Sequence, residues 1–159
     1  MRERSIRKPN RLKGYDYSKK GAYFVTICAK NMAELFSEIT VGATAPGRPS
    51  VKLSEIGKCV HETIQLQNKN DVLVDCFVIM PNHIHLIIIF VPQTGDRGRS
   101  PLHQIVRNIK SYVTKQNDFS PWQKSFYDRI IRNNDEYERI SKYIDDNPIP
   151  WFGDCFCHK

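Results

Sequence analysis

The motif MPNHIH at residues 80–85, followed by the run LIIIF at 86–90, constrains the fold more than any other part of the chain. The run is short, apolar and rich in β-branched residues, which is typical of a buried central strand. Because side chains alternate between the two faces of a strand, His83 and His85 point to one face and Ile84 to the other. Two imidazoles on one face predict a metal-binding pair, since imidazole is a common metal ligand. The alternative is a pair of hydrogen-bonded core histidines, and a metal site also requires a further ligand from elsewhere in the chain.

The length of 159 residues suits one domain that is large enough to bury a core. We expect residues 1–20 to form a basic arm and residues 21–151 to form the folded core. No apolar segment approaches the length of a membrane span, and the basic, then polar N-terminus does not resemble a signal peptide. We therefore expect a cytoplasmic protein without a membrane partner. Five cysteines are an odd count, so no disulfide framework is implied.

Positive charge is concentrated in the first twenty residues. They hold eight Lys or Arg side chains against two acidic ones, which accounts for six of the seven net charges of the chain. Such an arm is typical of a phosphate-binding tail, because Lys and Arg release condensed counterions from nucleic acid; a solvated tail is the alternative. Within the arm, Lys13 is a candidate phosphate contact. Tyr15 is a candidate for stacking on unpaired bases, although it fits packing on the edge of a sheet equally well.

Periodicity and turn signals divide the chain into seven main elements. Strands are predicted at 22–29, 72–79, 83–90 and 122–131, with a turn at 80–82 and a loose hairpin or loop at 32–53. Helices are predicted from an N-cap at Ser54 to residue 67, over 102–115, and from a cap at Asn133 or Asn134 to residue 147. This order predicts an α+β, ferredoxin-like split βαβ fold with an antiparallel sheet. Its two earlier helices cover one face of the sheet, and the last helix is expected to cover the other and to bring its residues to the histidines.

Individual positions on the helices carry further expectations. On the middle helix, Tyr112 continues the apolar face, while Arg107 and Lys110 lie toward the other side. On the last helix, Tyr143 lies beside an apolar stripe. The residues alone are therefore compatible with either a packing role or a functional role for Tyr143. Because Asn147 precedes a proline, its backbone is expected to leave the helical region.

Three motifs in order carry a family resemblance: PNHIH at 81–85, WQKSFY at 122–127 and YIDDNP at 143–148, with GAYFVTI at 21–27 as the first strand. With them, the chain resembles the single-tyrosine HUH transposases, and among these the REP-associated tyrosine transposases. The resemblance implies a metal-dependent single-stranded DNA endonuclease and strand transferase that acts on single-stranded or hairpin DNA repeats. It implies that His83, His85 and Asn147 bind Mg²⁺ or Mn²⁺. It also implies that Tyr143 is the nucleophile that forms a 5′-phosphotyrosine intermediate.

Physical chemistry is consistent with these implied roles. Tyr143 and Asn147 are four residues apart, so they lie on the same face of a helix. A phenol with a pKa of ~10 is a poor nucleophile at neutral pH, so a cation that polarises the phosphate supplies much of the catalysis. Two imidazoles and an amide are softer than Mg²⁺ normally prefers, and Mn²⁺ suits them at least as well.

Several alternatives stay open at the level of the sequence. The candidate phosphate contacts outside the arm are Arg107, Lys110 and Arg129. A domesticated protein that binds hairpin DNA without cutting it, and an unrelated metallohydrolase, are the competing functions. Both a monomer and a homodimer are compatible with the sequence. The cluster of Cys155, Cys157 and His158 is interpreted as an incidental tail rather than a zinc site.

Overall fold

The computed structural model describes residues 21–40, 49–69, 71–90 and 101–151. Four strands form the main sheet: β1 (Gly21–Cys28), β4 (Val72–Ile79), β5 (His83–Phe90) and β6 (Tyr127–Ile131). Their order is β4-β5-β1-β6, and every neighbouring pair is antiparallel. The two-histidine strand β5 is therefore central, between β4 and β1, as predicted.

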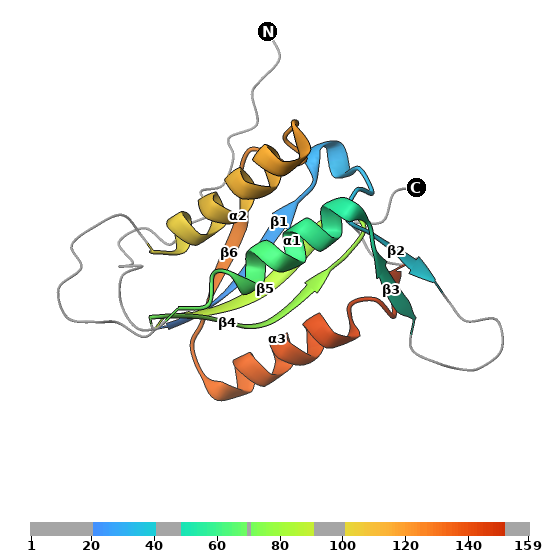
Figure 1. The fold of residues 1–159 in the computed structure, drawn as a ribbon. Helices are drawn as coiled ribbons and strands as arrows, with labels where there is room; N and C mark the ends of the chain where they lie inside the picture. The colour runs from blue at the N-terminus through green and yellow to red at the C-terminus, as the bar shows by residue number, and fades with distance from the viewer. Residues whose placement is uncertain (1–20, 41–48, 70, 91–100, 152–159) are drawn as a thin grey trace, which may run out of the picture.

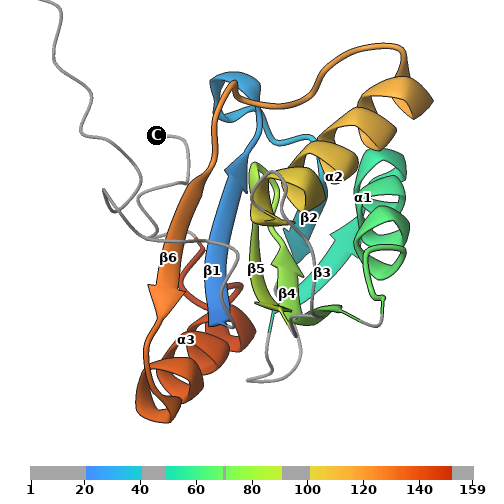
Figure 2. The same ribbon diagram turned by 90° about the vertical axis from the view of Figure 1, so that its left-hand side faces the viewer.

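Helices cover both faces of this sheet. Helices α1 (Glu55–Gln65) and α2 (Pro101–Asn117) lie on one face, and α3 (Asn134–Asp146) lies on the other (Figure 1 and Figure 2). This confirms the α+β ferredoxin-like fold and the added C-terminal helix. None of the described helices is long and apolar enough to cross a membrane.

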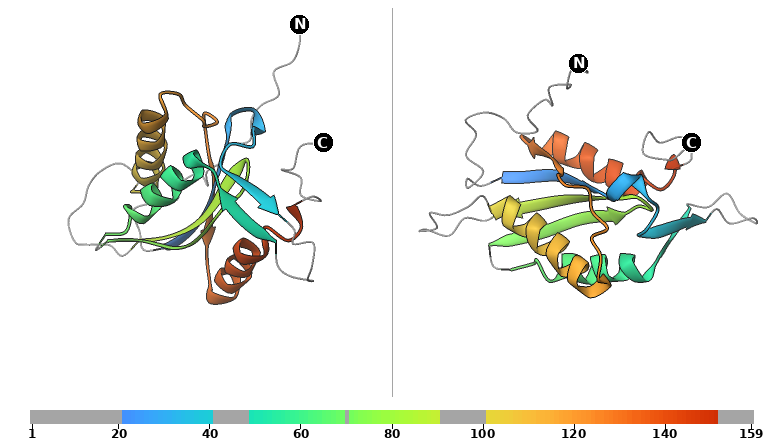
Figure 3. Two further views of the ribbon diagram at one scale, coloured as in Figure 1. Left: turned by 45° about the vertical axis from the view of Figure 1, so that its right-hand side comes forward. Right: turned by 90° about the horizontal axis from the view of Figure 1, so that it is seen from above.

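Two small elements complete the described fold. The segment expected to be a hairpin or loop contains β2 (Ser37–Thr40) and β3 (Ser50–Leu53), which pair antiparallel beside one end of the main sheet (Figure 3). A short 3₁₀ helix, η1 (Lys30–Met32), follows β1.

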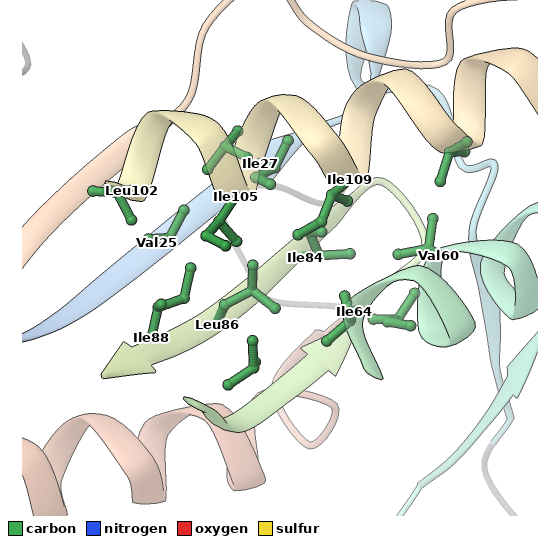
Figure 4. Packing of buried hydrophobic residues seen from close by; sticks show 14 of the residues in the cluster. Val25, Ile27, Val60, Ile64, Ile84, Leu86, Ile88, Leu102, Ile105 and Ile109 are labelled. Atoms are coloured by element: carbon green, nitrogen blue, oxygen red, sulfur yellow. The ribbon is translucent and has the colours of Figure 1, made fainter. Parts of the chain in front are cut away.

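The alternation along β5 divides its side chains between two hydrophobic clusters. Ile84, Leu86 and Ile88 pack with residues of α1 and α2 in the larger cluster (Figure 4). Ile87 packs on the opposite face against the buried Ile140 and Ile144 of α3 and Ile131 of β6. Because His83 and His85 share the side of Ile87, they lie in the layer that α3 covers.

Two predicted helix caps are present. The Ser54 hydroxyl accepts a hydrogen bond from the Gly57 N–H at 3.0 Å at the start of α1. At the start of α3, the Asn133 side chain accepts one from the Glu136 N–H at 2.8 Å, so Asn133 and not Asn134 is the cap. These bonds satisfy donors that the first turn of a helix leaves without intrahelical partners.

Three local predictions are wrong. The fourth strand begins at Tyr127 rather than at residue 122. The Trp122 side chain packs in the main core, and the Trp122 backbone pairs only as an isolated β-bridge to Ala29, the residue after β1. Tyr112 is 39% exposed and does not continue the core face of α2. Asn147 has helical backbone angles, φ −53° and ψ −36°.

The conformation of Asn147 follows from the hydrogen bonds around it. Its N–H donates to the Ile144 carbonyl at 3.3 Å, and the Ile149 N–H donates to the Asp146 carbonyl at 2.9 Å. These bonds extend the last turn of α3 past the helix end and outweigh the modest preference against helical angles before a proline. The side chain of Asn147 consequently continues the helical register that Tyr143 begins.

Candidate active site

Backbone hydrogen bonds hold the turn that precedes the histidine pair. The Pro81 carbonyl accepts from the N–H groups of Leu35 and Phe36 at 2.8 and 2.9 Å. The Asn82 carbonyl accepts from the Ala29 N–H at 2.8 Å, at the end of β1. The start of β5 is therefore fixed by two separate segments, so the first histidine has a defined position.

His83 and His85 lie side by side in the interior, with ring centroids 4.6 Å apart. The Nδ1 of His83 pairs with the Asn82 side-chain oxygen at 2.7 Å. Because an amide oxygen only accepts, this Nδ1 carries the proton and Nε2 keeps its lone pair. The Nδ1 of His85 pairs with the Thr26 hydroxyl of β1 at 2.8 Å. Partners of this kind orient imidazoles whose other nitrogen binds a metal.

Burial, and then the neighbouring His83, lowers the pKa of His85 to about 3. Taking a charged imidazolium out of water is unfavourable, so the ring is neutral at pH 7. A neutral imidazole is the form that binds metals.

Tyr143 of α3 reaches the pair from the other side of the layer. Its hydroxyl lies 3.5 Å from the Nε2 of His85, a loose contact rather than a well-formed hydrogen bond. Its ring is 5.4 Å from the His85 ring and stands edge-on to Phe24 at 6.1 Å. The residue is 43% exposed. A phenol held beside a buried histidine is thus still accessible to a large substrate.

Asn147 lies one helical turn beyond Tyr143 and is buried, with 1% of its surface exposed. Among the described residues, neither its Oδ1 nor its Nδ2 has a hydrogen-bond partner. Four residues further on, the Trp151 ring lies 6.1 Å from the His83 ring. The segment 143–151 therefore contacts His85 at one end and His83 at the other, with Asn147 midway between them.

The donor chemistry of these residues fits a divalent cation. A buried amide without partners costs about 1–3 kcal/mol, which an ion bound through its oxygen would offset. Two imidazole nitrogens and one amide oxygen are three neutral ligands, which leave coordination positions for other groups. Within the part of the chain that the structure describes, no group of three His, Cys, Asp or Glu side chains could hold a metal.

Comparison with known proteins gives one relative in sequence. The chain is 35% identical to an uncharacterised protein of Haemophilus influenzae over 169 residues, which cover 91% of this chain and 89% of that protein. The chain belongs to the same family as this protein. No family model matches the sequence.

Comparison with solved structures gives the fold. A REP-associated tyrosine transposase bound to a REP hairpin superposes with a TM-score of 0.56 at 20% identity, over 87% of this chain and 73% of the other. The chain has the fold of a REP-associated tyrosine transposase. A second structure, described as a transposase candidate from Deinococcus radiodurans, gives a TM-score of 0.44 at 17% identity, over 86% of this chain and 95% of that one. That likeness is too low to add to the assignment of the transposase fold.

The predicted phosphate contacts lie elsewhere on the transposase fold and differ from one another. Arg107 is exposed on α2. The Lys110 ammonium donates to the carbonyls of Gln123 and Ser125 at 2.8 and 2.9 Å. Arg129 on β6 is paired with the Glu136 carboxylate of α3. Lys13, Tyr15 and the cluster of Cys155, Cys157 and His158 lie outside the described residues.

Three residues near the pair were not predicted from the sequence: Thr26, Asn82 and Trp151. Asn82 lies inside the histidine motif, and its adjacency to His83 was the available signal. Thr26 and Trp151 become neighbours of the histidines only through the pairing of β1 with β5 and the path of the chain after α3.

Proposed function

We propose that this protein is a metal-dependent single-stranded DNA endonuclease and strand transferase that works through a 5′-phosphotyrosine intermediate on Tyr143. The observation that supports this most directly is the 3.5 Å approach of the Tyr143 hydroxyl to His85, from a helix 58 residues away in sequence. The structural neighbour with the transposase fold is bound to a REP hairpin, which supports hairpin DNA as the substrate class.

In this proposal, His83, His85 and Asn147 hold the divalent cation, Mg²⁺ or Mn²⁺. The bound ion would supply polarisation of the phosphate and stabilisation of the charge that develops on it. All three ligands are neutral, so no carboxylate among them reduces the positive charge that the phosphodiester meets. The imidazole nitrogens favour Mn²⁺ at least as much as Mg²⁺.

The Tyr143 oxygen is the nucleophile. It forms a bond to phosphorus and loses its proton to solvent, while the bond from phosphorus to the 3′ oxygen breaks and that oxygen takes up a proton. The products are a 5′-phosphate ester on Tyr143 and a free 3′-hydroxyl. Because the ester keeps the energy of the phosphodiester, attack by another 3′-hydroxyl joins strands without ATP and releases the tyrosine.

The residues around Tyr143 support this role. Phe24 and His85 contact its ring from the sheet, which limits the directions that the hydroxyl can take. Its partial exposure gives a nucleic acid strand access to the oxygen. By contrast, Tyr137 donates its hydroxyl to Asp75, and this bond, with burial, raises its pKa to about 12. The Tyr137 hydroxyl is therefore occupied by Asp75 and ionises less readily than that of an ordinary tyrosine.

The test compares wild type, Tyr143→Phe and Tyr112→Phe on labelled single strands that carry the hairpins of the host's own repeats. Tyr112 is a matched control because it is similarly exposed but lies on α2, across the sheet. With Mn²⁺ we expect a covalent protein–DNA adduct in wild type and Tyr112→Phe and none in Tyr143→Phe, with binding of the hairpin retained in all three. Mass spectrometry of the adduct assigns the modified residue.

Two outcomes would contradict the proposal. An adduct that persists in Tyr143→Phe would assign the nucleophile to another residue. Hairpin binding by wild type without any metal-dependent cleavage would favour a domesticated protein that only holds DNA.

A further inference from the structure

A second polar surface lies on the α2 side of the sheet, across from Tyr143. The C-terminal half of α2 and residues 120–124 enclose an open hollow of about 390 Å³. Three lysines line it, Lys110, Lys115 and Lys124, and none of the described residues in its wall is acidic. We call this hollow the lysine pocket. Its positive charge suits a negatively charged ligand.

The remaining polar groups of the lysine pocket suit a phosphate group. Ser111, Thr114 and Ser120 present hydroxyls in the same wall. Phosphate oxygens accept hydrogen bonds from hydroxyls and ammonium groups, and such contacts position a nucleic acid backbone without reading its sequence. Binding of this kind does not require side chains that recognise the bases.

One wall of the lysine pocket is held rigidly. The Lys110 ammonium bonds to the carbonyls of Gln123 and Ser125, and the Trp122 indole N–H donates to the Lys110 carbonyl at 3.2 Å. Burial lowers the pKa of Lys110 to about 8, so it remains positively charged at pH 7. Lys110 thus orders the chain that carries Lys124 and contributes charge from a fixed position.

The other two lysines are exposed, and within the described residues neither forms an ion pair. Lys115 comes from α2 and Lys124 from the segment before β6, so the two approach the hollow from different elements. Their charge is consequently available to a ligand.

The lysine pocket is connected to the histidine turn by backbone contacts. The Ala29 N–H donates to the Asn82 carbonyl, and the next N–H, that of Lys30, donates to the Pro121 carbonyl at 2.7 Å. The C-terminal half of α2, which lines the pocket, therefore lies toward the end of the sheet where the histidine strand begins, on the opposite side of the sheet from α3 (Figure 1 and Figure 2). A strand that leaves the active site around this end would pass η1 and reach the lysines.

We propose that the lysine pocket binds a backbone phosphate in the single-stranded DNA that flanks the hairpin. This inference rests on the proposed function for its DNA, but concerns a separate surface that binds the strand and takes no part in the chemistry.

The test uses Tyr143→Phe as background, so that binding is measured without cleavage. Lys115→Gln/Lys124→Gln is compared with Lys52→Gln/Lys69→Gln, which removes the same charge from exposed lysines outside the pocket. Affinity is measured against salt concentration for a hairpin alone and for hairpins with 5′ or 3′ single-stranded flanks of increasing length.

For sufficiently long flanks, we expect the slope of log affinity against log salt to be less steep in the pocket variant, closer to zero by about 0.7, the value for one single-strand phosphate contact. For the bare hairpin we expect the pocket and control variants to have the same slope. Equal slopes of the two variants at every flank length would overturn the inference.

A second measurement separates DNA from free phosphate. Inorganic phosphate is titrated while the NMR signal of the Trp122 indole N–H is followed, because Trp122 lines the pocket. Saturable phosphate binding without any flank effect would assign the pocket to free phosphate and overturn the DNA inference.

The two proposals fail in different ways. A flank effect without covalent adducts in the wild-type protein would contradict cleavage and support the lysine pocket. Adducts together with slopes that do not respond to the pocket variant would support cleavage and contradict the pocket.

Discussion

Asn147→Leu separates a structural role of this residue from a role in metal binding. Asparagine and leucine side chains have the same number of heavy atoms and the same branching, so the exchange keeps the shape and removes the polarity. Asn147 is 1% exposed, and its amide atoms have no hydrogen-bond partner among the described residues. In the metal-free protein the buried amide of Asn147 therefore lowers the free energy of unfolding.

The expected magnitude follows from that burial. An unsatisfied buried amide costs about 1–3 kcal/mol, so Asn147→Leu should raise the free energy of unfolding of the metal-free protein by that amount. For a chain of this size, this corresponds to an increase in Tm of roughly 2–12 °C. The same substitution removes one of three proposed ligands, so the stabilisation by metal should be lost. For wild type, that stabilisation is about 2.7 kcal/mol when Mn²⁺ is at 100 times its Kd.

The assay is thermal unfolding of wild type, Asn147→Leu and Asn147→Asp, each in EDTA and in Mn²⁺. Asn147→Asp is the control, because it keeps an oxygen ligand and adds a negative charge. We expect Asn147→Asp to be less stable than wild type in EDTA and to regain stability with Mn²⁺, since a buried carboxylate needs a cation.

The opposite pattern would refute the reasoning. If Asn147→Leu lowers stability in EDTA by more than about 1 kcal/mol and leaves the Mn²⁺ effect unchanged, the amide makes structural contacts and binds no metal.

Three further substitutions test the surroundings of the site. A Cβ at Gly57 would lie 1.9 Å from the Phe36 carbonyl oxygen. In Gly57→Ala this clash should exceed the gain of about 1 kcal/mol in helix propensity. We therefore expect urea unfolding to show a loss of about 2 kcal/mol or more in the free energy of unfolding. Ile144→Ala, in the fully buried contact of α3 with the sheet, should cost about 2–5 kcal/mol and reduce the hydrogen-exchange protection of α3. The N–H of Arg132, and then the charge of Arg129, lower the pKa of Glu136 below its ordinary 4.5. The ionised Glu136 carboxylate therefore contributes fully to stability above pH 4.5, and this contribution is lost as the pH falls through the lowered pKa. Glu136→Gln should be less stable than wild type at pH 7, and the difference in stability should shrink at lower pH.

Each of these has a control and a contradicting result. Lys58→Ala changes the exposed neighbour of Gly57, and a Gly57→Ala protein that is as stable as this control would refute the close packing. An Ile144→Ala protein with unchanged α3 protection would show that α3 is held by other contacts. A Glu136→Gln difference that does not depend on pH would exclude the carboxylate charge as its cause.

Local patterns in the sequence were enough to predict the order of elements, the central position of β5 and the helix caps. These features depend on a few neighbouring residues: the alternation of His83, Ile84 and His85, and the cap side chains of Ser54 and Asn133. Such patterns extend over only a few residues, so they can be recognised in the sequence without knowledge of the rest of the fold. The four-residue spacing of Tyr143 and Asn147 belongs to the same class.

Which groups meet depends on the folded arrangement and not on any local pattern. Thr26 pairs with His85 because of the register of β1 against β5, and Trp151 reaches His83 because α3 crosses the face where the pair lies. The Lys110 ammonium, a candidate phosphate contact from the sequence, donates hydrogen bonds to the carbonyls of Gln123 and Ser125, in a segment that was predicted to be part of the fourth strand. Strand register and helix docking are set by the packing of the whole core, and short stretches of sequence do not contain that information.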